Sequence, residues 1–127
     1  MSDFKFDKHQ KLKSRSAISS LFAHGKPAKG YPVQLIWEIP QDSECSGIRV
    51  GFVAPKRKFR KAVDRNRVKR LMREAYRLNR HLLTSNQDDL TLNIMVIYMP
   101  GEILSFEHVE RGMAKALKRL RSKLETT

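Results

Sequence analysis

The segment from residue 56 to residue 80, KRKFRKAVDRNRVKRLMREAYRLNR, most constrains how this chain can fold. It carries twelve Lys or Arg residues against two acids, so its net charge of +10 is most of the +13 of the whole chain. Apolar residues recur within it three or four apart, which is the period of a helix with one buried face. The segment is therefore expected to form a helix whose apolar side packs on a core and whose basic side stays outside.

This helix is expected to run from about residue 62 to residue 82, with a basic face opposite its apolar stripe. The stripe comprises Val68, Leu71, Met72, Ala75 and Leu82. Residues three or four apart on a helix share a face. The residues that this rule groups on the basic face are Asn66, Arg70, Arg73 and Arg77, flanked by Lys69 and Arg80. Such a face is either a solvated surface or a polyanion site, and its near lack of acids favours the polyanion.

The first turn of the helix is also basic. Arg65 and Arg67 lie where the helix dipole already favours an anion, so these cations gain nothing from the dipole and repel one another. An external phosphate chain is the expected counter-charge, and the bidentate contacts of arginine favour a shaped RNA. A second basic group precedes the helix and comprises Lys56, Arg57, Lys58, Arg60 and Lys61. That group either tracks a nucleic-acid backbone or is a floppy charged loop.

The rest of the chain alternates between helical and strand patterns. The other expected helices are residues 14–24 and 106–124, and the expected strands are residues 31–39, 48–54 and 90–99. The strand over 90–99 has apolar residues on both faces and is expected to be central. Residues 26–30 are expected to form a loop, and residues 40–47 a hairpin-type loop. This order of elements predicts an α+β sandwich in which helices pack on a sheet.

Composition limits the class of protein. A chain of 127 residues is enough for one domain, 1–127, whose first ten residues are expected to be flexible. The pI near 10.3 is typical of proteins that bind nucleic acids or anionic surfaces. Cys45 is the only cysteine, which fits a reducing compartment. Because no apolar run is long enough for a secretory signal or a membrane span, we expect a cytoplasmic protein without a membrane partner.

Side chains suited to catalysis are not grouped in the sequence. His9, His24, His81 and His108 are scattered and have no carboxylate at ligand spacing. We therefore expect no catalytic residues and no metal ligands in the protein. A protein-only nuclease would need clustered carboxylates or histidines to hold metal ions, so this class is disfavoured.

Two aromatic residues have two open interpretations. Phe22 lies on the first expected helix and Trp37 on the first expected strand. If the sheet face that holds Trp37 is only partly covered, the pair would form a stacking platform for single-stranded RNA. Large aromatic side chains are also common in protein cores. The sequence leaves both roles open.

Residues 62–76, AVDRNRVKRLMREAY, closely resemble the RNR signature of the bacterial ribonuclease P protein component. Further segments resemble that family in the same order along the chain, namely residues 11–13, 21–25, 49–52, 56–57 and 92–97. The resemblance implies a two-layer α/β sandwich with a mixed central sheet and a left-handed βαβ crossover. This is the fold of ribosomal protein S5 domain 2.

The resemblance also implies two binding surfaces. The surface for the catalytic RNA would comprise Arg65, Asn66, Arg67, Lys69, Arg70, Arg73 and Arg77. The surface for the 5′ leader of precursor tRNA would be a cleft between the first helix and an open sheet face. It would comprise Ile18, Phe22, Leu35 and Trp37, with Lys56 and Arg57 at its rim.

The function implied by the resemblance is that of the protein subunit of ribonuclease P, which helps a catalytic RNA to remove the 5′ leader of precursor tRNA. The RNA would perform the hydrolysis with Mg²⁺ that it holds itself, so the protein alone would be inactive. The implied partners are the ribonuclease P RNA and precursor tRNA, with no protein partner required. The alternative is a general RNA-binding or ribosome-associated domain, which would share the charge and fold but not the RNR signature.

Overall fold

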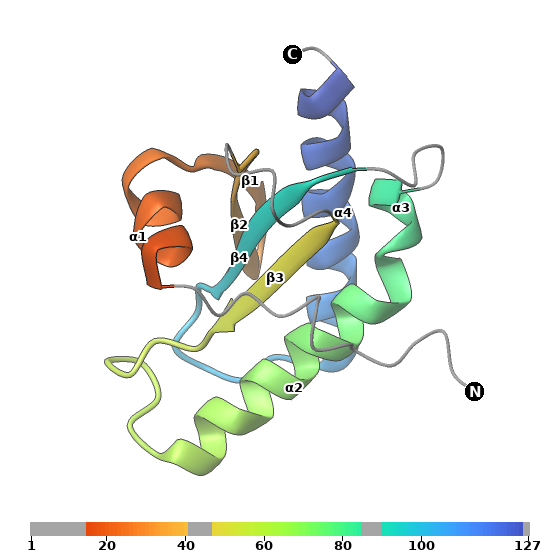
Figure 1. Cartoon of the computed structure of the whole chain (residues 1–127). Coiled ribbons are helices and arrows are strands. Elements are labelled where there is room, and N and C mark those ends of the chain that lie inside the picture. Colours follow the sequence, from red (N-terminus) through yellow and green to blue (C-terminus); the bar gives the residue numbers. More distant parts are fainter. Residues whose placement is uncertain (1–14, 41–46, 85–89, 126–127) are drawn as a thin grey trace, which may run out of the picture.

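Figure 1 shows the architecture of the chain in a computed structural model, which describes residues 15–40, 47–84 and 90–125. The helices are α1 (Arg15–His24), α2 (Ala62–Asn79), α3 (His81–Thr84) and α4 (Phe106–Glu125). The strands are β1 (Lys26–Gly30), β2 (Val33–Glu38), β3 (Ile48–Val53) and β4 (Leu92–Tyr98). The expectations for the first ten residues and for Cys45 lie outside the described residues.

Strand β4 lies inside the sheet, whose strand order is β1-β2-β4-β3. β2 pairs with both β1 and β4 in antiparallel orientation, whereas β3 and β4 are parallel. Six of the seven residues of β4 are buried, as expected for a strand that is covered on both faces. The predicted central strand and the mixed sheet are therefore confirmed.

Strands β2 and β3 do not pair with each other, although they follow one another in the chain. The prediction of a hairpin between them is wrong, because β4 lies between them in the sheet. A polar loop between two strand patterns is typical of a hairpin. Here the strand with apolar residues on both faces takes the inner position, and β3 joins it in parallel through the crossover that contains α2.

Residues 26–30 form strand β1 and not the predicted loop. Pro27 and Gly30 suggested a loop, but β1 is an edge strand, where a proline leaves no ladder hydrogen bond unmade. Its pattern is also weak because the two residues it buries, Ala28 and Gly30, are small. These small residues allow α4 to approach β1 closely.

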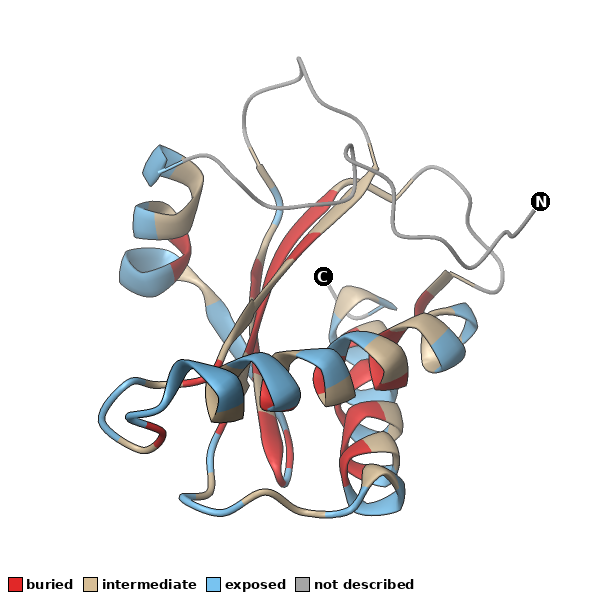
Figure 2. Ribbon diagram, turned by 90° about the horizontal axis from the view of Figure 1, so that it is seen from below, coloured by how far each residue is buried: buried red, intermediate tan, exposed pale blue. Residues whose placement is uncertain are grey.

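The main core lies between the sheet and the layer formed by α2 and α4, as the red segments of Figure 2 indicate. The sheet contributes Val33, Leu35 and Trp37 of β2, Val50 of β3, and Leu92, Ile94, Val96 and Tyr98 of β4. The helices contribute Val68, Met72, Ala75 and Tyr76 of α2, and Val109, Met113, Ala116, Leu117 and Leu120 of α4. The apolar stripe predicted over residues 62–82 is therefore confirmed, but this segment forms two helices and not one, and Leu82 lies on α3.

Helix α1 covers the opposite face of the sheet with a smaller cluster. Leu21 is fully buried against Met95 of β4. Partly buried apolar side chains complete this cluster, namely Ala17, Ile18, Ile36, Val53 and Ile97. The predicted end of the first helix at residue 24 is confirmed, and the Gly25 N–H donates to the carbonyl oxygen of Leu21 over 2.8 Å.

The contact between β1 and α4 depends on two glycines. A Cβ atom on Gly112 would lie 2.3 Å from the carbonyl oxygen of Tyr31 and 2.5 Å from that of Gly30. A Cβ atom on Gly30 would lie 2.1 Å from the carbonyl oxygen of Gly112. Backbone atoms cannot turn aside as a side chain can, so glycine is required here for close packing.

Replacing Gly112 by alanine should therefore destabilise the protein. Overpacking costs about 1–3 kcal/mol, and a clash with two backbone oxygens belongs at the upper end, at about 3 kcal/mol. The advantage of about 1 kcal/mol that alanine has over glycine within a helix offsets part of this cost. We expect the free energy of unfolding, measured by urea denaturation, to fall by about 2 kcal/mol. Gly101→Ala is the control, because a Cβ atom at Gly101 meets nothing within 4 Å. Equal stability of the two variants would contradict this account.

Candidate nucleic-acid interface

The basic side of α2 lies outside the core, as predicted (Figure 2). Asn66, Arg67, Arg70 and Arg73 are exposed, whereas Arg65, Lys69 and Arg77 are half-buried. The helix that carries them is held to the core through Val68, Met72, Ala75 and Tyr76. The cations are therefore presented on a rigid support, which lowers the entropy lost when they contact a partner.

Arg73 marks the direction of this face. Its guanidinium carbon lies 5.7 Å from the ring centre of Phe52 on β3, and that ring packs edge-on against Tyr76 at 6.1 Å. Burial raises the pKa of Tyr76 to about 12, so its hydroxyl is neutral at physiological pH and adds no negative charge beneath the arginines. Arg73 on the basic face of α2 therefore turns toward β3, which is one of the two edge strands of the sheet.

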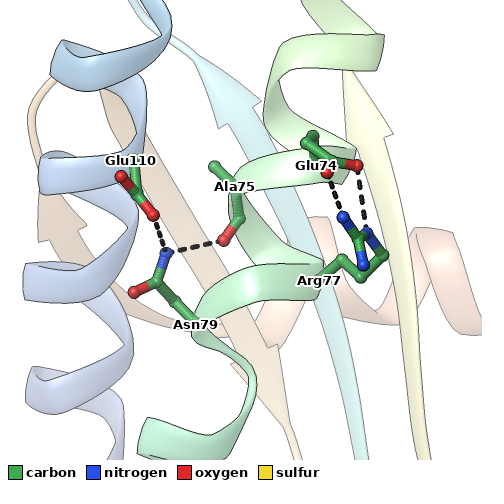
Figure 3. A network of polar contacts seen from close by, with 5 residues as sticks. All are labelled: Glu74, Ala75, Arg77, Asn79 and Glu110. Atoms are coloured by element: carbon green, nitrogen blue, oxygen red, sulfur yellow. Dashed lines mark hydrogen bonds and ion pairs between the residues drawn. The ribbon is translucent and has the colours of Figure 1, made fainter. Parts of the chain in front are cut away.

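The C-terminal end of the face is less positive than the sequence suggests. Arg77 forms an ion pair with Glu74 through two hydrogen bonds, one of them 3.0 Å from Nε to Oε2 (Figure 3). The hydrogen bond from Arg77 lowers the pKa of the Glu74 carboxyl, which keeps it ionised. The structure thus places Arg77 at the predicted face with an acid partner already in place, whereas Arg70 and Arg73 have no acid partner in the described chain.

Arg65 has an internal role that the sequence did not reveal. Its Nη1 atom donates to the carbonyl oxygens of Phe59 at 2.9 Å and of Arg60 at 2.8 Å. It therefore ties the first turn of α2 to the basic turn that precedes the helix. The sequence carries no signal for this contact, because a basic residue in a basic segment has many possible partners.

The basic turn itself has a defined conformation. Phe59 is buried and its ring lies 5.8 Å from that of Tyr98, while the N–H groups of Lys58 and Phe59 both donate to the carbonyl oxygen of Pro55 at 3.1 Å. The ammonium group of Lys58 contacts the carbonyl oxygen of Met99. The alternative of a floppy charged loop is therefore wrong. Lys56 and Arg57 are exposed on this turn, directly after β3.

Leu35 and Trp37 are not available at a cleft. They are 0% and 2% exposed and belong to the core beneath α2 and α4, and Lys26 covers the Trp37 ring at 5.5 Å. The expectation that these residues line an open groove is wrong, because it assigned the odd-numbered residues of β2 to the face that α1 covers. Alternate residues of a strand face opposite sides, so an error of one residue exchanges the faces.

The sheet face beside α1 instead carries the even-numbered residues of β2. Ser20 of α1 donates a hydrogen bond of 3.0 Å to Glu38, and Ile36 packs in the α1 cluster. Phe22 is 56% exposed on α1, while Ile18 is partly buried in the cluster. The structure therefore groups Ile18 with Ile36, a residue that the sequence did not single out, whereas Phe22 lies one helical turn after Ile18 and outside this cluster. Gln34, Ile36 and Glu38 lie on the same face of β2, and an apolar residue between two polar ones on that face indicates a partly covered surface.

The described residues contain no group of three or more His, Cys, Asp or Glu side chains that could hold a metal ion. Within the same ranges, no helix is long and apolar enough to cross a membrane.

Replacing Arg65 by alanine should loosen the basic turn. The two carbonyl hydrogen bonds would be lost, so we expect amide hydrogen exchange at Lys58 and Phe59 to become roughly tenfold faster. Arg67→Ala is the matched control, since Arg67 is exposed on the same turn of α2. The same exchange rates in both variants would show that Arg65 does not hold the turn.

The comparisons with known proteins agree with one another. The sequence model of the family described as Ribonuclease P matches residues 6–121. The ribonuclease P protein component of Porphyromonas gingivalis is 35% identical over 119 residues, which cover 92% of this chain and 87% of that protein. The protein component of Chlorobium phaeobacteroides is 32% identical over 126 residues, covering 90% of this chain and 86% of the relative.

Solved structures confirm the fold. The ribonuclease P protein of Thermotoga maritima superposes with a TM-score of 0.68 at 24% identity, covering 86% of this chain and 96% of the other. The Staphylococcus aureus protein gives a TM-score of 0.68 at 19% identity, covering 86% and 93%. The fold is thus the expected ribosomal protein S5 domain 2-like fold. By these matches the chain belongs to the ribonuclease P protein family, whose known role is 5′ processing of tRNA together with an RNA subunit.

Proposed function

We propose that the chain is the protein subunit of a ribonuclease P holoenzyme and binds its catalytic RNA through the basic face of α2. The observation that carries this proposal is the row of Asn66, Arg70 and Arg73, which is exposed on a helix whose other side is packed in the core. Phosphate groups spaced along an RNA backbone are the complementary partner of such a row. The family relationship supports this choice over other polyanions.

In this proposal the RNA carries out the hydrolysis and the protein contributes charge and position. The side chains of the described residues do not fit a metal site, so we assign the Mg²⁺ ions to the RNA. Phosphate groups of catalytic RNA and substrate repel one another when the two RNAs meet. Arg70 and Arg73 offset this repulsion, which lowers the Mg²⁺ concentration that the reaction needs. Since precursor tRNA is the proposed substrate, we place the protein in the cytoplasm.

The 5′ leader of the precursor is proposed to bind on the α1 side of the sheet. The supporting observation is that Phe22 is exposed on α1, one helical turn after Ile18, which packs with Ile36 in the cluster beneath α1. An exposed aromatic ring can stack on any unpaired base, so such a site accepts leaders of different nucleotide sequence. Lys56 and Arg57 are exposed on the turn after β3 and supply positive charge for the leader backbone.

A reconstitution experiment tests the proposed function. The purified protein alone should cleave no precursor tRNA, but with a bacterial ribonuclease P RNA it should restore cleavage at low Mg²⁺, and chelation of Mg²⁺ should abolish the activity. In Arg70→Ala/Arg73→Ala the slope of log affinity for the RNA against log salt should become less steep by about 2, because two phosphate contacts are lost. The Arg70→Lys/Arg73→Lys variant keeps the charge and should keep the slope. Cleavage by the protein alone, or failure to assist the RNA, would refute the proposal.

The leader site predicts a difference between two aromatic residues. Phe22→Ala should weaken binding of precursor tRNA roughly tenfold, as expected for the loss of one stacked base, and should leave binding of mature tRNA unchanged. Trp37→Phe is the control, since Trp37 is buried and should affect stability rather than leader binding. Equilibrium binding of the holoenzyme to both tRNAs measures this difference. Equal losses for the two tRNAs would remove Phe22 from the leader site.

A further inference from the structure

Helix α4 carries a second basic surface that the proposed function does not use. Arg111, Lys115 and Lys118 are exposed and lie three or four residues apart, so they form one row along the helix. They line a shallow hollow of about 470 Å³. Among the described residues, the ion pairs involve Glu74 and Glu125, and neither acid is paired with this row.

Internal contacts on both flanks of α4 fix the direction of the row. On the β1 side, Arg119 Nη1 donates to the carbonyl oxygen of Lys29 over 2.7 Å. On the α3 side, Arg121 Nη1 donates to the carbonyl oxygen of Leu83 over 2.9 Å. The buried stripe of α4 faces the sheet. The row is therefore left on the outer side of the helix.

An exposed aromatic ring lies beside this row. Tyr31 is 69% exposed, and it lines a hollow of about 180 Å³ together with His108, Arg111 and Lys115. Arg111 and Lys115 line both hollows, so the two are neighbours on the surface of α4. The close approach at Gly112 holds the backbone of Tyr31 against α4. A ring next to a row of cations is the arrangement by which proteins bind single-stranded nucleic acids, with a base on the ring and phosphates on the cations.

The row of cations on α4 differs from the basic face of α2 and from the cluster beneath α1. α1 and α4 lie on opposite sides of the sheet (Figure 1). Arg73 on the basic face of α2 turns toward β3, whereas α4 packs on β1 and β2 at the other edge. Where the two helices meet, Glu110 of α4 accepts a hydrogen bond of 3.5 Å from Asn79 of α2 (Figure 3). An acidic residue therefore lies between the two groups of cations.

We propose that Tyr31, Arg111, Lys115 and Lys118 form a second RNA-binding surface, which takes an unpaired segment of the same catalytic RNA that α2 binds. Three phosphate contacts to a single strand give a salt slope of only about −2, so the surface alone binds a free strand weakly. An RNA already held by α2 presents its other segments at a high effective concentration, and a weak second contact then adds to the affinity. This inference rests on the proposed function.

The test measures the affinity of the full chain for a bacterial ribonuclease P RNA. Arg111→Ala/Lys115→Ala/Lys118→Ala should make the salt slope less steep by about 2, and Tyr31→Ala should lower affinity roughly tenfold. Tyr31→Phe keeps the ring and Lys115→Arg/Lys118→Arg keeps the charge, so both should bind like the unchanged protein. All these side chains are exposed, and thermal unfolding should show that every variant folds.

Crosslinking locates the bound segment. A photoreactive group on Ser122→Cys, in a Cys45→Ser background, should reach unpaired nucleotides that differ from those reached from Asn66→Cys on α2, because Ser122 is exposed and lines the hollow beside Lys115 and Lys118 without belonging to the proposed binding residues. Failure to crosslink, or crosslinks to the same nucleotides from both positions, would overturn the inference.

The α2 variant separates this inference from the proposed function. If Arg70→Ala/Arg73→Ala loses affinity while the α4 variants bind normally, the second RNA-binding surface is refuted and the proposed function stands. The row on α4 would then fit an acidic protein partner instead. If neither set of variants changes the affinity, the proposed function and the inference both fail.

Discussion

Burial of strand β4 on both of its faces is the constraint on which the rest of the structure depends. Its apolar residues need cover from both sides, and this cover comes from α2 and α4 on one face and from α1 on the other. The strand also needs a neighbour along each edge, and β2 and β3 fill these places. The crossover from β3 to β4 then has to pass over one face of the sheet, which lays α2 across the core.

The placement of charge follows from this arrangement. The apolar stripe of α2 is used in the core, so its cations remain outside, and the same holds for α4. Because the two helices cover opposite halves of one sheet face, their outer sides diverge. One molecule therefore offers cations on two separate surfaces, with a third basic group on the turn after β3. A protein of this shape can contact several segments of a folded RNA at once, which suits the binding role proposed above.

The sequence predicted the helices and the central strand well, because each has a strong period and enough length. Val68, Met72 and Ala75 mark α2 without ambiguity, and residues 106–125 repeat the same pattern. The sequence-based prediction failed where a strand was short, or where both faces of a strand carried apolar residues. Strand β1 has only small buried residues. In β2 both alternating sets contain apolar residues, so parity alone could not show which set faces the main core, and Trp37 was assigned to the wrong side.

The sequence alone determined that the chain has a rigid, exposed, basic helix and resembles the ribonuclease P protein family. Those properties depend on residues that are close together in the chain, so the spacing of apolar and basic residues is enough to predict them. Only the tertiary structure decided the roles of individual side chains. Arg65 ties the turn to α2, Trp37 is buried, and Tyr31 lies beside the cations of α4. Each of these facts depends on which elements become neighbours across the sheet, and burial of the whole core sets that choice.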